Sequence, residues 1–385
     1  MFEKALVGSK RYWTWVAFLL ALTGIGAILY LWQLKVGLKI TGMGRDVSWG
    51  FYIGNFTYLV GIAAGGVMVA LPFYLHNYKA FGRIVVLGEF MAVAAVIMCL
   101  SFIIIDLGKP MRAFNVLFHP TPNSILFWDM VVLNVYLLLN IFVGWNALQA
   151  ERNDVPPPTW VKVLAVFSVA WAPLIHIVTA FIYQGLPGRH YWLTAIMAPR
   201  FLASAFTSGP ALLLVIALII KRYTKFDPGE VAIQTIGKIV TYCIIINVAF
   251  FLFEVFTSFY SQIPGHMQHF KYLFFGLKGH GIMAPLMWIS IIGMITASIL
   301  LVIPGIRRNE TTLALCCILV VISTWLDKGP GLMAGGFIPN PLHEIVEYWP
   351  TLPEALITLG VWALGFLILT VLYKIAISVH EEIEV

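Results

Sequence analysis

Several ionisable side chains stand inside long apolar stretches of the sequence, where no water would solvate a charge. His176 and Glu254 lie well within such stretches, and Asp106 and Asp129 lie near the ends of two others. A charge at the centre of a lipid bilayer costs roughly 2.5–3.5 kcal/mol on insertion scales. Side chains retained at that cost are candidates for function, and for histidines and carboxylates the first candidate is proton transfer.

The same stretches are rich in aromatic residues, and acids, a histidine and aromatic rings together suit an amphipathic ring such as a quinol. Aromatic faces hold the ring, and a histidine or carboxylate takes a proton as an electron leaves. We therefore expect His176 and Glu254 to be the proton acceptors.

Four further side chains have expected supporting roles. Asp106 and Asp129 would shape the rim of the pocket or the proton exit, and Trp192 and Arg200 would orient the ring or support the adjacent loop. A structural interpretation stays open for each, and for Asp327, because terminal Asp and Arg residues commonly cap helices or reach lipid headgroups. A buried histidine can likewise serve packing by bonding a neighbouring helix.

Histidine and cysteine positions argue against a redox centre or metal site in this chain. A b-type haem usually needs paired axial histidines inside a bundle, and only His176 is placed for that role. The other histidines are expected at helix ends or in loops: His76, His119, His190, His266, His269, His280, His343 and His380. The four cysteines occupy apolar stretches without CxxC spacing: Cys99, Cys243, Cys316 and Cys317. We expect no haem, no iron–sulfur cluster and no metal here.

The composition defines the elements that must position these residues. Of 385 residues, 60% are hydrophobic and 11% are charged, too few charges to solvate a globular surface. The net charge of +6 is small and forms no basic face, which excludes nucleic-acid binding. The chain is expected to be one integral membrane domain over residues 1–385.

Ten continuous apolar segments are long enough to cross a bilayer as helices, and none alternates as a strand would. They are 12–33, 51–75, 84–106, 125–148, 161–184, 201–220, 231–260, 280–303, 311–327 and 354–378. An even number places both termini on one side. Fourteen of the 24 Lys and Arg residues lie on that side, which predicts cytoplasmic termini in the cell membrane. The longer connections then face outward: 34–50, 107–124, 185–200, 261–279 and 328–353.

A weak internal repeat divides the helices. The second helix, AGGVMVALPFYLHNYKAF, and the sixth, SGPALLLVIALIIKRYTKF, share a small-residue start and a basic-aromatic end. The following helices carry Glu89 and Asp106 in one case and Lys238 and Glu254 in the other, at similar spacing. We interpret helices 2–5 and 6–9 as two four-helix bundles with helices 1 and 10 outside, although chance similarity stays open. Glu89 and Lys238 either pair with each other or begin a proton route. The glycines of GIAAGG predict a close helix contact.

Two longer motifs carry a family resemblance. The segment DLGKPMRAFNVLFHPTPNSILFWD, from Asp106 to Asp129, resembles the DLGRPxR…HPxPxS segment of the NrfD-like membrane subunits. The segment HIVTAFIYQGLPGRHYWLTAIMAPRFLASAFTSGPAL, from His176, is similar to the family's H…W…AP-F-xSA-xSG-AL segment. Lys109 stands where the family usually has Arg, which keeps the charge. The ten-helix count resembles the longer branch of the family, the DsrP-type or Hdr-like menaquinol oxidoreductase membrane subunits.

The resemblance implies a menaquinone or menaquinol site near the outer face and an extracytoplasmic ferredoxin-like iron–sulfur subunit on the outer loops. It also implies cytochrome c and b-type membrane subunits and a cytoplasmic Hdr-like iron–sulfur subunit, in respiratory sulfur metabolism. We expect a quinol-oxidising subunit, or one that is not catalytic alone. Two other classes stay open: a secondary transporter, which repeats and buried charges also suit, and a cofactor-free anchor for redox partners.

Overall fold

The chain is all-helical in the computed structural model, which describes every residue except 1, 68, 70–71, 74–78, 154 and 384–385. The long helices are α1 Lys10–Val36, α2 Phe51–Val67, α4 Gly82–Asp106, α6 Ile125–Arg152, α7 Thr159–Gln184, α8 Met197–Tyr223, α9 Glu230–Tyr260, α11 Ala284–Val302, α13 Glu310–Leu326 and α15 Leu352–Ile383. Shorter elements connect them: η1 Phe2–Leu6, η2 Leu38–Ile40, η3 Lys79–Phe81, η4 Pro110–Phe114, α5 Asn115–Phe118, α10 Pro264–Phe275, α12 Pro304–Arg308, η5 Asp327–Gly331 and α14 Leu332–Phe337.

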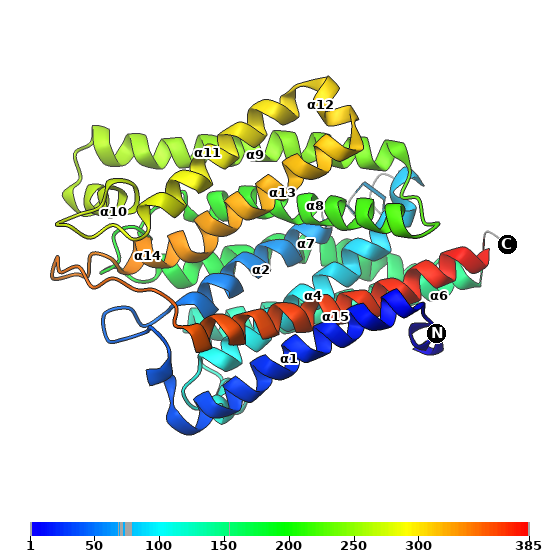
Figure 1. Ribbon diagram of the computed structural model, residues 1–385, viewed down its shortest axis with the longest axis horizontal. Coiled ribbons are helices and arrows are strands. Elements are labelled where there is room, and N and C mark those ends of the chain that lie inside the picture. The colour runs from blue at the N-terminus through cyan, green and yellow to red at the C-terminus, as the bar shows by residue number, and fades with distance from the viewer. Residues whose placement is uncertain (1, 68, 70–71, 74–78, 154, 384–385) are drawn as a thin grey trace.

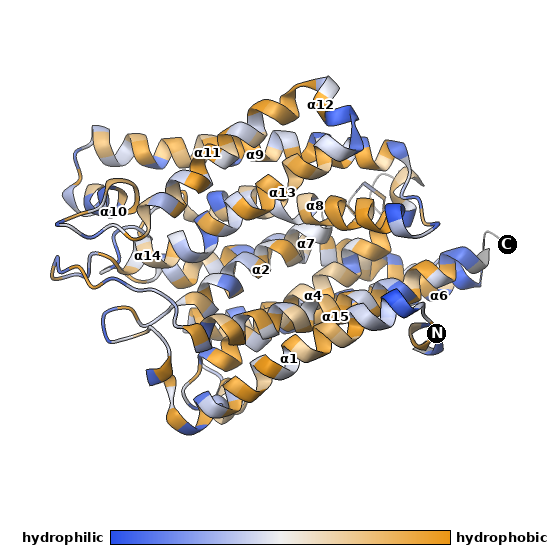
Figure 2. Cartoon of the chain, in the orientation of Figure 1, coloured by the Kyte–Doolittle hydropathy of each residue, from blue (hydrophilic) through white to orange (hydrophobic). Residues whose placement is uncertain are grey.

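Nine helical spans within the described residues are long and apolar enough to cross a membrane. They correspond to nine of the ten segments expected from the sequence. The other expected segment, 51–75, contains α2, and part of its second half lies outside the described residues. The expected all-α, multi-pass membrane fold is therefore confirmed, and Figure 2 shows hydrophobic residues along the long helices.

The helices form two four-membered groups that match the proposed division. In the first bundle α2 packs on α4, α4 on α6, α6 on α7, and α7 on α2. In the second bundle α8 packs on α9, α9 on α11, α11 on α13, and α13 on α8. Helices α1 and α15 pack on each other outside these groups, and α15 contacts α4 and α6. Helix α8 joins the bundles because it also contacts α2 and α7.

Figure 1 shows both termini at one end of the molecule, which we call the terminus end. The α8–α9 connection lies at this end as well, and α12 adjoins the same end of α9, where Gln234 Nε2 donates to the Arg308 carbonyl oxygen. The opposite end, which we call the loop end, carries α10, α14 and the long connections (Figure 1). The even number of crossings expected from the sequence agrees with this arrangement.

Glycines set the distance between the bundles. A Cβ atom built on Gly65 of α2 would overlap the carbonyl oxygen of Ala205 in α8, and one built on Gly209 of α8 would overlap the backbone of Gly65. Only glycine permits such backbone approach. The close contact predicted from GIAAGG is confirmed, and its partner is the helix that joins the bundles.

Several helix boundaries differ from the sequence expectation by four residues or more. The sixth helix begins at Met197 rather than 201 and so includes Arg200. The ninth span does not end at 327 but continues through the π-helical turn η5 and α14 to Phe337. Pro330 has no N–H group, so this turn cannot keep the regular α-helical ladder, and the wider turn accommodates it. The eighth helix begins at Ala284 rather than 280. His280 therefore precedes the helix, where its Nδ1 atom lies 3.2 Å from Glu347 Oε2.

Candidate functional site

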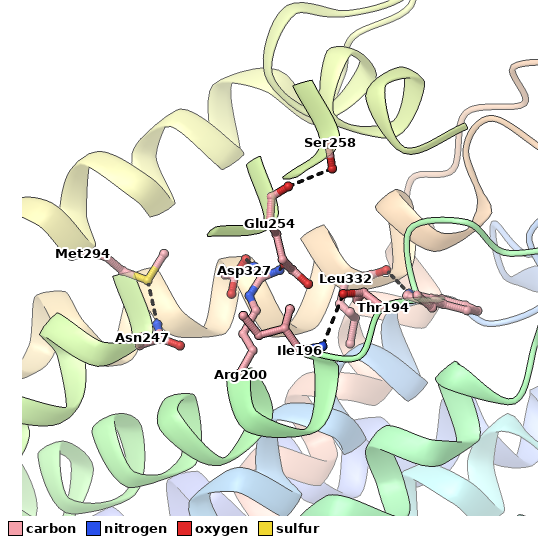
Figure 3. Close-up of polar contacts among 10 residues, drawn as sticks. Thr194, Ile196, Arg200, Asn247, Glu254, Ser258, Met294, Asp327 and Leu332 are labelled. Carbon is pink, nitrogen blue, oxygen red and sulfur yellow. Dashed lines mark hydrogen bonds and ion pairs between the residues drawn. The ribbon is translucent and has the colours of Figure 1, made fainter. Parts of the chain in front are cut away.

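A buried ion cluster lies at the loop-end half of the second bundle. Arg200 on α8 donates through Nη1 to Glu254 Oε2 on α9 and through Nη2 to Asp327 Oδ1 in η5, the latter at 2.6 Å (Figure 3). All three side chains are at least nine-tenths buried. Buried carboxylates are tolerated when a guanidinium neutralises them through paired hydrogen bonds. Arg200 thus ties three helical elements of this bundle together at one point.

A second cation lies next to this cluster. Lys328 follows Asp327 in η5 and is also buried, with 3% of its surface exposed. Its Nζ atom has no hydrogen-bond partner within the described chain and stands 3.9 Å from the centroid of the Phe201 ring. An aromatic face attracts an ammonium group but does not replace a hydrogen bond. Lys328 is therefore the least satisfied charged group of the site.

His176 reaches the same aromatic ring from the first bundle. Its imidazole lies 5.1 Å from Phe201, centroid to centroid, and its Nδ1 atom is buried without a hydrogen-bond partner in the described part of the chain. Since Phe201 directly follows Arg200 on α8, this helix brings His176 close to the ion cluster. The structure therefore unites three of the predicted site residues, His176, Arg200 and Glu254, around adjacent positions of α8.

Two successive charged residues are buried in the π-turn, and they meet different partners. Neighbouring residues of a helix point about 100° apart. In η5, Asp327 meets Arg200 while Lys328 meets Phe201, and Gly329 and Gly331 are buried too. π-turns of this kind recur at functional sites in helical proteins.

Trp192 belongs to an aromatic group that closes the site toward the loop end. Its indole Nε1 donates to the Leu332 carbonyl of α14 at 2.9 Å, and its ring contacts Trp49, Tyr183 and Phe337. A Cβ atom on Gly336 would overlap Cε2 of Trp192, so the indole fills the space beside that glycine. Trp192 therefore packs against α14.

Asp129 and Asp106 lie in the first bundle. Asp129 of α6 accepts a 2.6 Å hydrogen bond from Thr179 Oγ1, and Thr179 stands one turn beyond His176 on the same face of α7. Asp129 therefore lies near His176. Asp106 ends α4 instead, with a buried Oδ1 atom that has no hydrogen-bond partner among the described residues, and no contact connects it to Arg200.

The sequence analysis did not identify Lys328, Phe201 or Tyr183 as site residues. Lys328 falls in DKGPG, whose glycines and proline predicted a loop and concealed a buried cation. The sequence feature that could have indicated its burial is the position of this lysine directly after the apolar segment 311–327. Glu89 and Lys238 also differ from their expected match, because Glu89 is buried in α4 whereas Lys238 is exposed on α9.

An apolar cavity of about 230 Å³ borders the same π-turn. Its walls include Phe51, Trp325, Leu326, Pro330 and Met333. Within the described ranges, no group of three or more His, Cys, Asp or Glu side chains is placed to hold a metal ion.

Comparison with known proteins fits this arrangement. The model of the family described as "Polysulphide reductase, NrfD" matches residues 39–330, which include both bundles up to the π-turn. The chain belongs to the NrfD family. This NrfD chain is 26% identical to a Halobacterium salinarum protein named as a membrane subunit of a dimethyl sulfoxide reductase, over 93% of this chain and 89% of that protein.

Two other relatives of the NrfD chain match over nearly their full length. A selenate reductase subunit of Mesobacillus selenatarsenatis is 24% identical, over 98% of this chain and 96% of that protein. The Hdr-like menaquinol oxidoreductase integral membrane subunit of Archaeoglobus fulgidus is 25% identical, over 99% of this chain and 97% of that protein.

Proposed function

We propose that this chain is the quinone-binding membrane subunit of a multi-subunit menaquinol oxidoreductase. It exchanges electrons between menaquinol and an iron–sulfur partner subunit docked on the loop end. The observation that carries the proposal is the set of buried ionisable groups around Arg200 and Phe201, which two bundles contribute. The name of the Archaeoglobus relative supports menaquinol as the substrate.

The residues present suit the two oxygens of a quinol ring. His176 Nδ1 and Lys328 Nζ are buried, have no hydrogen-bond partner in the described chain, and both adjoin the Phe201 ring. An oxygen atom of the ligand would satisfy each of them. The apolar cavity beside η5 is smaller than the roughly 300–1,000 Å³ of pockets for drug-sized ligands, so it would take only an apolar part of the molecule.

Menaquinol supplies two electrons and two protons when it is oxidised. In this proposal His176 accepts one proton, and Glu254 accepts the other through its Oε1 atom, which has no partner in the described chain. Arg200 holds Glu254 in position, and Asp129 lies on the exit side of His176 through Thr179. Asp106 would belong to the outer rim.

The proposal includes an orientation and partners. The terminus end faces the cytoplasm, so the loop end faces outward and receives the ferredoxin-like iron–sulfur subunit. Cytochrome c and b-type membrane subunits and a cytoplasmic Hdr-like iron–sulfur subunit would complete an assembly of respiratory sulfur metabolism. Labelling of single cysteines in 221–230 from the outside of intact cells would contradict this orientation.

The test uses the assembled complex and follows quinol-dependent reduction of the partner's iron–sulfur cluster. Replacing one well-placed acid–base group typically costs about 10²–10⁴-fold in rate. We expect losses of that size for His176→Leu and for Glu254→Gln, which keeps shape and hydrogen bonding. Glu230→Gln, at an exposed position on the same helix as Glu254 but at the terminus end, is the matched control. Wild-type rates in both variants would exclude these residues, and reduced assembly with normal turnover would make His176 a packing residue.

One observation favours a secondary transporter as the second candidate. The ninth span is interrupted at η5, beside buried charges, and transporters bind substrates at interrupted helices. Substrate-driven proton movement into vesicles that contain this chain alone would support transport over quinol oxidation.

A further inference from the structure

A groove lies between α1 and α4 at the edge of the molecule, with α15 as its floor. Helix α1 packs on α15 and α15 packs on α4, so the three helices lie side by side (Figure 1). Gly26 of α1 and Gly360 of α15 bring two backbones into direct contact, because a Cβ atom on either glycine would overlap the other. Beside this contact, a cavity of about 220 Å³ separates α1 from α4.

The cavity is lined almost entirely by hydrocarbon. Apolar side chains from all three helices form its walls, and its polar side chains are three hydroxyls. Those of Tyr30 and Ser101 already donate to backbone carbonyl oxygens of α4, whereas that of Thr23 is buried without a partner in the described chain. One hydroxyl cannot satisfy the two oxygens of a quinone ring, but a hydrocarbon chain needs no partner. The groove therefore suits a lipid acyl chain.

Residues typical of the membrane interface follow directly after the groove on α1. Trp32, two residues beyond Tyr30, is 45% exposed, and such rings gather at the level of the lipid headgroups. Gln33 Nε2 donates to the Ile105 carbonyl oxygen at 2.8 Å, which closes the gap between α1 and α4. Lys35, in the last turn of α1, lies about 8 Å beyond Tyr30 along the helix axis. A lipid whose chain occupies the groove would thus have its headgroup beside Lys35.

Further basic side chains gather where η2 meets the connection after α4. The two segments touch, since a Cβ atom built on Gly108 would lie 3.7 Å from Leu38 Cδ1. Lys39 and Lys109, which directly follow these two residues, therefore lie near each other, and both are exposed. The Arg112 amide donates to the Lys109 carbonyl oxygen, so a third cation belongs to the same turn. We call these cations and the last-turn lysine of α1 the basic patch: Lys35, Lys39, Lys109 and Arg112.

The charge balance of these connections favours an anion. Residues 34–50 and 107–124 contain five Lys and Arg residues, half of the ten that the sequence assigns to the loop-end side. Their one acid is Asp46, which accepts a 3.0 Å hydrogen bond from Asn340. Asp106 at the end of α4 is the other acid nearby, and its Oδ1 atom is buried. Clusters of Lys and Arg beside membrane helices attract anionic lipid headgroups.

We propose that the groove and the basic patch together form a binding site for an anionic phospholipid. One acyl chain lies between α1 and α4 on α15, and the phosphate is bound by the basic patch. Only four of the 27 residues of α1 are buried by the protein itself, so the lipid adds to the contacts that hold α1 beside the first bundle. The site involves none of the residues around Arg200 and does not rest on the proposed function.

Native mass spectrometry of the delipidated chain in detergent micelles tests the headgroup contact. The probes are dioleoyl-phosphatidylglycerol, which is anionic, and dioleoyl-phosphatidylcholine, which has the same chains but no net charge. Each Lys or Arg near a lipid surface contributes about five-fold in affinity. We therefore expect tighter binding of phosphatidylglycerol, and a loss of about 25-fold in that binding for Lys39→Gln combined with Lys109→Gln.

The matched control removes two exposed cations at the terminus end, by Arg222→Gln combined with Lys225→Gln. This variant should bind phosphatidylglycerol as the wild type does. Equal binding of the two lipids by the wild type would overturn the proposal. Undiminished binding of phosphatidylglycerol after loss of Lys39 and Lys109 would overturn it as well.

Ala27→Phe tests the groove, because it places a ring in the cavity and leaves the basic patch intact. Ala27 lines the cavity but is exposed, so the larger side chain does not disturb the protein core. Displacing only two methylene groups of a bound chain costs about ten-fold in affinity. We expect at least that loss for phosphatidylglycerol. Ile28→Phe, at the next position, 68% exposed and outside the cavity wall, should bind normally.

Two results of this experiment would contradict the site. Wild-type affinity in Ala27→Phe would place the lipid outside the groove. Displacement of bound phosphatidylglycerol by an equal concentration of menaquinone would make a quinone the occupant of the groove instead.

Discussion

Replacing Arg200 by methionine would test the buried ion cluster most directly. The substitution keeps the length and much of the volume of the side chain but removes the guanidinium that meets both Glu254 and Asp327. Two carboxylates would then remain in a site where each is at least nine-tenths buried. Removing one partner of a buried ion pair typically destabilises a protein by about 3–5 kcal/mol.

The loss should be at the upper part of that range, because one substitution leaves two acids without their partner. Lys328 is the other cation nearby, but its Nζ atom lies on the Phe201 ring and forms no hydrogen bond with either acid in the described chain. We therefore expect Arg200→Met to lower the free energy of unfolding by about 4–5 kcal/mol. Arg200→Lys should lower the free energy of unfolding by less, because it keeps the positive charge. Some loss should remain, because a lysine cannot bridge two carboxylates with separate nitrogens.

The assay is reversible unfolding of the purified chain in mixed micelles, with Glu254→Gln and Asp327→Asn measured alone and combined with Arg200→Met. If the acids are destabilising only when unpaired, the triple variant should recover part of the loss seen in Arg200→Met. A change of less than about 1 kcal/mol in Arg200→Met would refute the reasoning, since that is the range of exposed ion pairs. Absence of any recovery in the triple variant would show that Arg200 acts through packing.

Three other predictions concern packing and pH. Gly336→Ala places a methyl group against the Trp192 indole, so we expect a loss of about 1–3 kcal/mol and altered tryptophan fluorescence; an unchanged spectrum would contradict this contact. Gly65→Ala should separate α2 from α8 and lower the thermal stability, whereas Gly24→Ala, where a Cβ meets nothing within 4 Å, should not; equal melting temperatures for the two would refute the close contact. Burial lowers the pKa of His269, which lies in α10 outside the spans, to about 4, so the folded state keeps this imidazole neutral. The free energy of unfolding should therefore fall by up to about 3 kcal/mol as the pH falls from 6.5 to 4. His269→Gln should flatten the pH dependence of unfolding over that interval, and an identical slope would show that other groups cause it.

The sequence by itself determined the membrane fold, because the hydrophobic effect acts on long apolar segments whatever their partners are. The segment boundaries and the matching small-residue starts of the second and sixth helices also predicted two bundles. The glycines of GIAAGG predicted a close contact through their lack of a side chain. The ionisable side chains of His176, Arg200 and Glu254 indicated a site, because such groups are costly inside a membrane whatever their partners are.

Only the tertiary structure decided which of these charges meet. Glu254 and Asp327 are 54 and 127 residues from Arg200, and no local pattern pairs side chains over such separations. The burial of Lys328 could not be predicted from the sequence either. Glycine and proline around it favour a loop unless neighbouring helices stabilise a π-turn. Local residue types set the cost of each buried charge, whereas the packing of α8 against both bundles determines which partner offsets that cost.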